Sequence, residues 1–132
     1  MITMKDFVPE KEPILREQAK AVEFPINEEL KETALAMRQF LINSQDPDMA
    51  EKYNLRPGMG LAAIQLGIPK RYFVVVNEYD EGQFETYVMI NPRMISNSVE
   101  KIYVDQGEGC LSVNRPVDGI IPRFARVTFE AY

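Results

Sequence analysis

The chain has 132 residues, of which 45% are hydrophobic and 27% charged, and its formal net charge is −5. This length and composition are typical of one globular domain with a single hydrophobic core. The negative charge argues against nucleic acid as a partner, because phosphate binding depends on excess lysine and arginine, and no apolar run is long enough to indicate a membrane span.

The N-terminal part predicts an irregular arm. Residues 1–26 contain three prolines and show little periodicity, so we expect no more than one turn of helix, within 14–21. Residues 1–10 are mixed and charged, unlike a signal peptide. The chain also has one cysteine, Cys110, which cannot form an internal disulfide. We therefore expect a cytoplasmic protein.

Two helices are predicted after the arm. Asn27 is a good N-cap for a helix over about 28–43, because apolar residues recur there at helical spacing: Leu30, Ala34, Met37 and Leu41. Asp46 as a cap, followed by a proline at the first helical position, predicts a second short helix over 47–53.

The second half of the chain predicts strands. Residues 72–76 are β-branched and aromatic, which favours a central strand buried on both faces. A turn at 80–82 leads to a returning strand over 86–90. Residues 94–104 predict a strand with an irregular middle, and 126–132 alternate as a last strand. The fold class expected is therefore α+β, a mostly antiparallel sheet packed against one main amphipathic helix.

Two short stretches do not fit a purely structural pattern. Residues 58–65 read Gly-Met-Gly-Leu-Ala-Ala-Ile-Gln, where Gly58 and Gly60 permit close backbone approach or positive φ. Gln65 then supplies a side-chain amide with two donors and an acceptor. Residues 108–112 read Glu-Gly-Cys-Leu-Ser and contain the single thiol. An amide and a thiol on glycine-rich backbone indicate a site built for chemistry.

These two motifs, in this order, resemble the first two signatures of the peptide deformylases. That family consists of metallohydrolases that remove the formyl group from the N-terminal methionine of new bacterial proteins. The resemblance extends from 13–16 to 122–127, and residues 43–57 resemble the longer form found in Gram-positive bacteria. It implies the deformylase fold, a formyl-methionyl peptide or nascent chain as substrate, and Fe²⁺ or Zn²⁺ as cofactor.

The resemblance also implies a role for six residues. Cys110 would be a metal ligand. The side chain of Gln65 and the backbone amide of Leu111 would donate hydrogen bonds to the oxyanion. Three further residues would contact the substrate. Gly60 would lie along the substrate backbone, Met59 would help to line the pocket for the substrate methionine, and Arg115 would lie near the exit of the site.

The third family signature, a helical His-Glu-x-x-His, is absent from these residues, which contain no histidine. A catalytic zinc or ferrous site needs about three protein ligands, and Cys110 supplies one. Glu108 and Asp105 are too close to it in sequence for us to expect convergence on one metal. Residue 64 is also isoleucine where the family usually has proline. We therefore expect 1–132 to be one deformylase-like domain, incomplete at its C-terminus and nearly inactive unless the chain continues or is completed.

Two other functional interpretations remain open. The first is a non-catalytic short paralogue that binds N-terminal methionine peptides or a protein partner. The second is a domain completed by another polypeptide, with self-association through the face that the missing helix would cover.

Several residues also have simpler structural interpretations. A lone cysteine is more often a small buried hydrophobe than a ligand, and no histidine is present to activate Cys110 as a nucleophile. Gln65 taken alone would be a core amide. Glu108 is expected to pair with Arg123 or Arg126, and Arg115 could equally be solvated surface.

Overall fold

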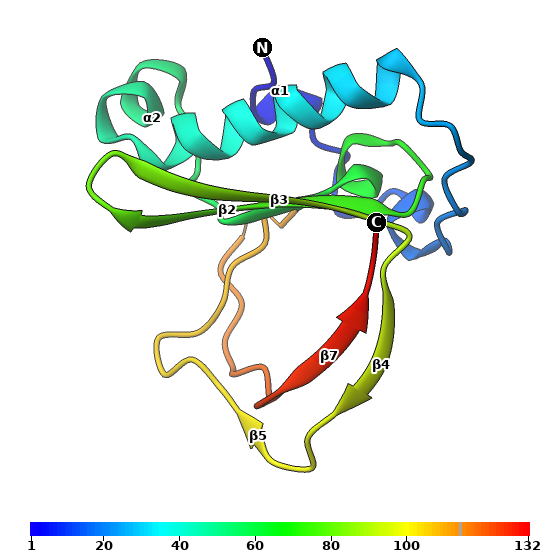
Figure 1. Cartoon of the computed structure of the whole chain (residues 1–132). Coiled ribbons are helices and arrows are strands. Elements are labelled where there is room, and N and C mark those ends of the chain that lie inside the picture. The colour runs from blue at the N-terminus through cyan, green and yellow to red at the C-terminus, as the bar shows by residue number, and fades with distance from the viewer. Residues whose placement is uncertain (114) are drawn as a thin grey trace.

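The computed structural model describes residues 1–113 and 115–132. The long helix α1 lies across one face of a sheet, and a second group of strands extends away from the opposite side of that sheet (Figure 1). The helical elements, in which η marks a 3₁₀ helix, are η1 (Met4–Asp6), η2 (Pro13–Arg16), α1 (Glu28–Gln45), α2 (Pro47–Tyr53) and η3 (Ala63–Leu66). The strands are β1 (Gly60–Ala62), β2 (Tyr72–Asp80), β3 (Gln83–Ile90), β4 (Arg93–Asn97), β5 (Lys101–Ile102), β6 (Arg123–Phe124) and β7 (Val127–Glu130). The predicted α+β class is confirmed.

Both predicted helices are present, and both begin at the predicted caps. The Asn27 side chain accepts a hydrogen bond from the backbone N–H of Leu30 at 2.8 Å, which satisfies one of the free amides at the start of α1. Asp46 caps α2 in the same way, through the N–H of Asp48. α1 continues two residues beyond the predicted end at 43, to Gln45. In the N-terminal arm, the helical turn expected within 14–21 lies at η2, where a proline occupies the first position.

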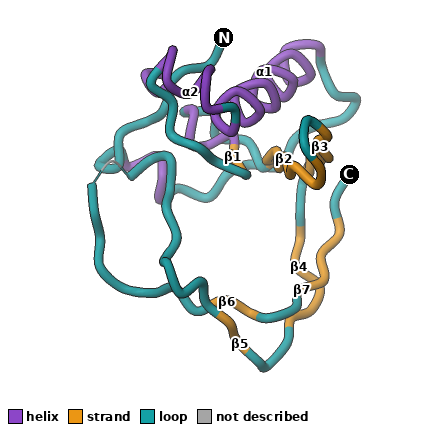
Figure 2. Tube along the Cα trace, turned by 90° about the vertical axis from the view of Figure 1, so that its left-hand side faces the viewer, coloured by secondary structure: helices purple, strands orange, loops and turns teal. Residues whose placement is uncertain are grey.

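The central sheet has the order β1-β2-β3, with both pairings antiparallel. Val74 in β2 lies opposite Leu61 on one side and Val88 on the other. It is fully buried, together with helix residues that pack on the same face: Met37, Phe40 and Leu41. This packing between α1 and β2 forms the hydrophobic core, and the view in Figure 2 shows α1 on one side of the strands.

The expectation that 72–76 is buried on both faces is wrong. Tyr72, Val74 and Val76 are buried, whereas the alternate residues Phe73 and Val75 are only partly buried. Successive side chains of a strand point to opposite faces, so one set faces α1 and the other faces the second group of strands. A run of apolar residues does not reveal how completely each face is covered.

The second group of strands is formed by the chain that leaves β3 and returns to it. β4 pairs with β7 and β5 pairs with β6, both antiparallel. The predicted strand over 94–104 is thus divided into β4 and β5. The interruption lies at 98–100, whereas the expected irregular middle is 96–98. The backbone of Tyr132 then exchanges two hydrogen bonds with Ile90, at 2.9 and 3.0 Å, which brings the last residue back beside the end of β3 (Figure 1).

Across the described ranges, no helix has both the length and the apolar character that a membrane span requires.

Candidate functional site

The backbone of the first motif is held at the edge of the central sheet by its hydrogen bonds with β2. The N–H of Val76 donates to the carbonyl of Met59 at 2.8 Å, so the backbone before β1 continues along β2. The chain then turns into η3, which carries Gln65. The side-chain oxygen of Gln65 accepts a hydrogen bond from the N–H of Ala62 at 2.9 Å. This contact holds the amide group in place and leaves its nitrogen as the donor that faces the second motif.

The second motif forms a tight turn. The N–H of Val113 donates to the carbonyl of Cys110 at 3.0 Å, which closes the turn over 110–113. The side chain of Leu111 is buried, and Cys110 is exposed. Among the residues the structure describes, none accepts a hydrogen bond from the Leu111 N–H. The Leu111 N–H and the Cys110 carbonyl belong to the same planar trans peptide group, so they point in opposite directions. The N–H therefore points away from the carbonyl that accepts the hydrogen bond of the turn.

The side-chain amide of Gln65 joins the two motifs. Its nitrogen lies 3.1 Å from the hydroxyl oxygen of Ser112 and 3.6 Å from the sulfur of Cys110. The structure therefore brings Gln65 and Cys110 together, and their roles in one site stay a prediction. Both donor hydrogens of the amide already have partners, so any further acceptor would have to replace one of them.

The two glycines of the first motif have different structural roles. A Cβ atom at Gly58 would lie only 2.9 Å from Leu111 Cδ1, with the rest of that isopropyl group within 3.4 Å. At Gly60 the nearest atoms would be 3.8 Å away or more, which is ordinary contact. Neither glycine has positive φ. Close approach within the chain therefore explains Gly58. At Gly60 no atom of the described residues comes as close, and its expected position along a substrate backbone stays a prediction.

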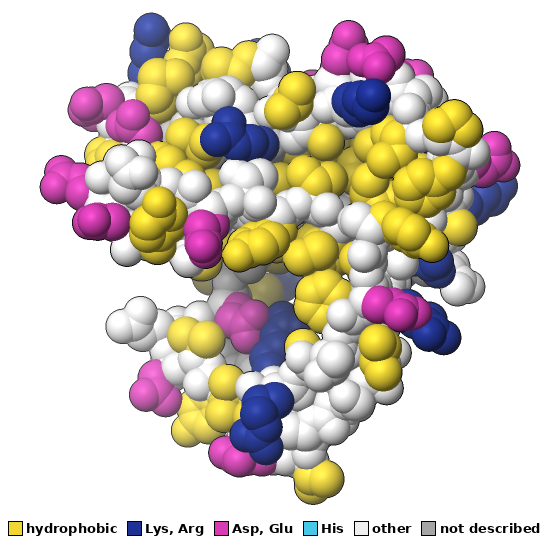
Figure 3. Space-filling view, in the orientation of Figure 1, with side chains coloured by type: hydrophobic (Ala, Val, Ile, Leu, Met, Phe, Trp, Pro, Cys, Tyr) yellow, Lys and Arg dark blue, Asp and Glu magenta, His cyan; other side chains and the backbone are white. Residues whose placement is uncertain are grey.

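A cavity of about 790 Å³ lies at the junction of the motifs. It is lined by Gln45, Arg56, Pro57, Gly58, Met59, Gly60, Gln65, Glu108, Gly109, Cys110 and Leu111. The lining thus includes residues of both motifs, and the side chain of Met59 is 58% exposed beside it. Figure 3 shows that the molecular surface is hollowed between the sheet and the second group of strands.

Two ion pairs hold Glu108 of the second motif and Arg115, which follows that motif. Arg123 and Glu108 approach to 2.8 Å, and the hydrogen bonds from this guanidinium hold the pKa of the Glu108 carboxyl below its usual value. The predicted structural pair of Glu108 is confirmed with Arg123 as its partner. Arg115 pairs with Glu10 of the N-terminal arm at 2.8 Å, and this pair likewise lowers the pKa of Glu10.

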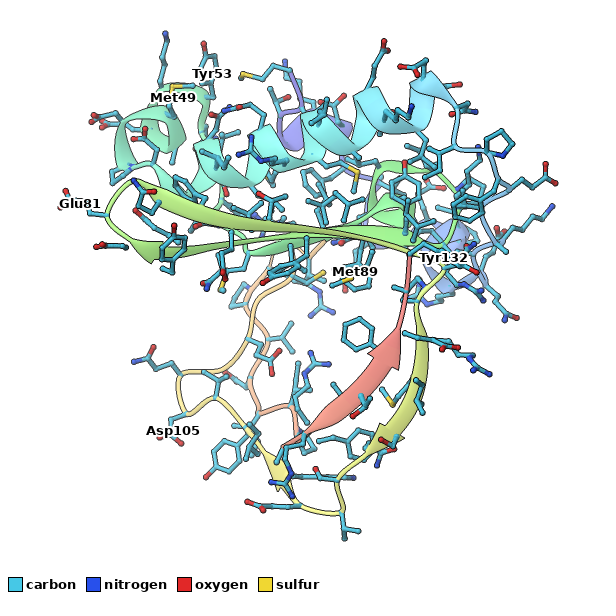
Figure 4. The ribbon with its side chains drawn as sticks, in the orientation of Figure 1. Met49, Tyr53, Glu81, Met89, Asp105 and Tyr132 are labelled. Carbon is cyan, nitrogen blue, oxygen red and sulfur yellow. The ribbon has the colours of Figure 1, made fainter. Side chains whose placement is uncertain are left out.

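The described residues do not form a complete metal site. Across 1–113 and 115–132, no group of three His, Cys, Asp or Glu residues lies close enough to hold one ion. Glu108 is engaged by Arg123. Asp105 lies out on the loop after β5 (Figure 4). Cys110 is therefore a single soft donor, and one thiolate does not fit a catalytic zinc or ferrous ion, which takes about three protein ligands.

Three residues of the site were missed by sequence reasoning. The hydroxyl oxygen of Ser44 accepts from the N–H of Gly58 at 3.1 Å, and Gln45 donates to the Gly58 carbonyl at 2.9 Å. Arg56 donates to the carbonyls of Leu111 and Val113. Polar side chains near a helix end and before a proline are ordinary surface features in a sequence, so no local signal distinguishes them.

Comparison with known proteins gives one consistent result. The family model described as polypeptide deformylase matches residues 4–132. A peptide deformylase of Halalkalibacterium halodurans is 54% identical over 132 residues, which cover 99% of this chain and 72% of the relative. Peptide deformylase 2 of Bacillus anthracis is 50% identical over 131 residues, which cover 99% of this chain and 71% of the relative.

Comparison with solved structures points to the same family. The peptide deformylase of Thermotoga maritima superposes with a TM-score of 0.68 at 30% identity, covering 95% of this chain and 71% of that structure. A probable peptide deformylase of Synechococcus phage S-SSM7 gives a TM-score of 0.71 at 27% identity, over 96% of this chain and 80% of that structure. With a family match over nearly its whole length and relatives about half identical to it, the chain belongs to the peptide deformylase family.

Proposed function

We propose that this chain recognises the N-formylmethionyl end of nascent proteins and contributes to hydrolysis of the formyl group. The observation that carries the proposal is the junction of Gln65 with Cys110 and Ser112 beside the cavity. A nascent-chain substrate is consistent with work in the cytoplasm.

The polar groups at the junction suit an oxyanion. Hydrolysis of a formyl amide passes through a tetrahedral intermediate, whose oxygen gains negative charge and is stabilised by N–H donors. The side-chain nitrogen of Gln65 and the backbone N–H of Leu111 are the two donors that we assign. Loss of one such donor typically lowers a rate by roughly 10²–10³-fold.

The substrate itself would lie along the cavity. Gly60 offers backbone at the edge of β1, and Met59 offers an exposed apolar side chain for the methionine of the substrate. Arg115 would lie near the point where the peptide leaves the site. Its pairing with Glu10 means that a substrate carboxylate or carbonyl would have to compete with that ion pair.

Peptide deformylases are metal-dependent, and Cys110 is the residue that we assign as a ligand here. Because the described residues supply only this donor, they do not by themselves hold a catalytic metal ion. We propose instead that the chain with these residues alone binds formyl-methionyl peptides and hydrolyses them slowly or not at all. Donors from outside this set would complete an Fe²⁺ or Zn²⁺ site.

The test is to measure peptide binding and turnover separately. Isothermal titration with a formyl-Met-Ala-Ser peptide measures binding, and release of formate with and without added Fe²⁺ or Zn²⁺ measures hydrolysis. The unformylated peptide is the control for recognition of the formyl group. Binding that requires the formyl group supports the proposal. Rapid metal-dependent turnover overturns the inference that more ligands are needed, and absence of binding overturns the recognition role.

The second candidate function is a non-catalytic binding module for N-terminal methionine peptides. The observation that favours it is that the cavity and the two donors are present although metal ligands other than the thiol are not gathered in the described residues. Equal affinity for formylated and unformylated methionine peptides, without formate release, would support this alternative over the deformylase proposal.

We also propose self-association through the β4–β7 apolar patch, defined by Met94, Val127 and Phe129. Met94 and Phe129 are cross-strand partners, and all three side chains are between 41% and 55% exposed. Adjacent exposed apolar side chains favour burial against another surface. A molar mass that rises with concentration in light scattering, and falls back in Phe129→Ser, would support this proposal, whereas a constant mass near 15.2 kDa would refute it.

A further inference from the structure

We infer that Arg56 is a positioning residue, which holds the Cys110 turn in the orientation that the oxyanion donor requires. The catalytic consequence of this inference rests on the proposed function, whereas the contacts of Arg56 do not depend on that function. Arg56 precedes the first motif, whereas the turn at 110–113 belongs to the second.

The contact between Arg56 and the turn is bidentate. One guanidinium nitrogen donates to the carbonyl of Val113 at 2.6 Å, and the other donates to the carbonyl of Leu111. An arginine fork has a fixed planar geometry, so two carbonyls held by one guanidinium keep a fixed relation to each other. Lysine, with a single ammonium group on a flexible stem, does not reproduce that constraint.

Each described residue of the turn after Cys110 is held by at least one contact from the first half of the chain. Arg56 fixes the carbonyls of Leu111 and Val113, Gln65 donates to the hydroxyl of Ser112, and Gly58 packs against the side chain of Leu111. The Arg56 contact is the one made to the turn backbone itself. It therefore determines the rotation of the turn relative to the cavity, and with it the direction of the Leu111 N–H.

The location of Arg56 matches this role. It lines the cavity together with Gln65 and Cys110, and it also lines two further cavities, of about 560 and 340 Å³, to which residues of the turn contribute as well. Arg56 therefore lies among the hollows that adjoin the turn. Loss of the fork should loosen the turn locally and leave the helix and sheet unchanged.

The experiment is amide hydrogen exchange followed by NMR on the full chain, for the wild type, Arg56→Met and Arg56→Lys. The reporter is the Val113 amide, whose hydrogen bond to the Cys110 carbonyl closes the turn. The reference is the amide of the buried Val74, which lies in β2 between two paired strands. A matched control is Arg38→Lys, because Arg38 also makes a long-range hydrogen bond, to Thr86 at 2.9 Å, away from the turn.

We expect exchange at Val113 to accelerate at least roughly tenfold in Arg56→Met and less in Arg56→Lys, with exchange at Val74 unchanged. The control should leave both amides at wild-type rates. Unchanged exchange at Val113 in Arg56→Met overturns the inference. Parallel acceleration at Val113 and Val74 also overturns it, because that result indicates general stabilisation and not local positioning.

A second readout links the turn to substrate. The Leu111 amide signal is followed while a formyl-Met-Ala-Ser peptide is added. We expect a saturable shift in the wild type and in Arg38→Lys, and a weaker or non-saturating shift in Arg56→Met. A peptide that leaves the wild-type Leu111 signal unmoved refutes the proposed function, whereas the exchange rates at Val113 still decide the role of Arg56.

Discussion

The side-chain nitrogen of Gln65 lies 3.1 Å from the hydroxyl oxygen of Ser112, and this contact between residues 47 positions apart connects the two motifs. The same nitrogen lies 3.6 Å from the thiol of Cys110. The side-chain oxygen of Gln65 is held by the N–H of Ala62, so the amide has one fixed orientation. These contacts fix how the first motif meets the second.

The first prediction concerns this amide. Replacement of Gln65 by leucine leaves the Ala62 N–H and the Ser112 hydroxyl without their partner, so the free energy of unfolding should fall by about 1–3 kcal/mol. Binding of a formyl-Met-Ala-Ser peptide should be lost as well. Urea denaturation and isothermal titration measure the two effects. Ser112→Ala is the matched control, since it removes one of these contacts and should cost only about 1 kcal/mol. Wild-type affinity in Gln65→Leu would contradict the assigned donor role.

The second prediction separates the two glycines of the first motif. Gly58→Ala places a methyl group 2.9 Å from Leu111 Cδ1, so the buried leucine must move, at a cost of roughly 1–3 kcal/mol. Gly60→Ala meets only ordinary contacts and should change the free energy of unfolding by less than about 1 kcal/mol. Paired urea denaturation curves provide the measurement. Equal destabilisation by the two alanines would mean that the space beside Leu111 is not the reason for Gly58.

The third prediction concerns Ser44, whose buried hydroxyl accepts from the Gly58 N–H and donates to the Leu41 carbonyl. Ser44→Ala removes the partner of a backbone amide in the core, so we expect a loss of about 1–3 kcal/mol in the free energy of unfolding. Thermal denaturation followed by circular dichroism is a suitable measurement.

Thr33→Ala is the matched control for this change, because Thr33 donates to a carbonyl of the same helix from its exposed side. A solvent-exposed hydroxyl bonded within a helix contributes little, so the control should stay within about 0.5 kcal/mol of the wild type. If both alanines had the same small effect, Ser44 would not be needed to hold Gly58.

The fourth prediction concerns pH. Arg123 lowers the pKa of Glu108 in the folded state, chiefly through side-chain hydrogen bonds. The pair therefore contributes stability above the unfolded glutamate pKa of about 4.3, and this contribution is lost as pH falls through the lower folded-state pKa. Because both groups are at the surface, the effect on stability is small, and the direct measurement is an NMR titration of the Glu108 carboxyl.

Arg123→Gln should raise the pKa of Glu108 back toward its ordinary value. Arg93→Gln is the matched control, because Arg93 pairs with Glu130 in the β4–β7 sheet and should leave the titration of Glu108 unchanged. If the titration midpoint of Glu108 stays the same in Arg123→Gln, a group other than Arg123 lowers the pKa of this carboxyl.

Much of the fold follows from local sequence patterns. Asn27 and Asp46 predicted the starts of α1 and α2, because side-chain caps act on amides two or three residues away. The turn at 80–82 and the returning strand followed from glycine and β-branched residues in the same way. The extent of burial of Phe73 and Val75 did not follow, because it depends on which segments cover the second face of the sheet.

The sequence by itself determined the family, the helices, the central strands and the two motifs, since motifs and periodicities are properties of neighbouring residues. The tertiary structure alone decided that Gln65 meets Ser112 and Cys110, that a side chain at Gly58 but not at Gly60 would crowd Leu111, and that Glu108 pairs with Arg123. It also revealed the support from Arg56 across 55 residues to Leu111. Each of these contacts joins residues that are distant in the chain, and no local spacing encodes such a distance.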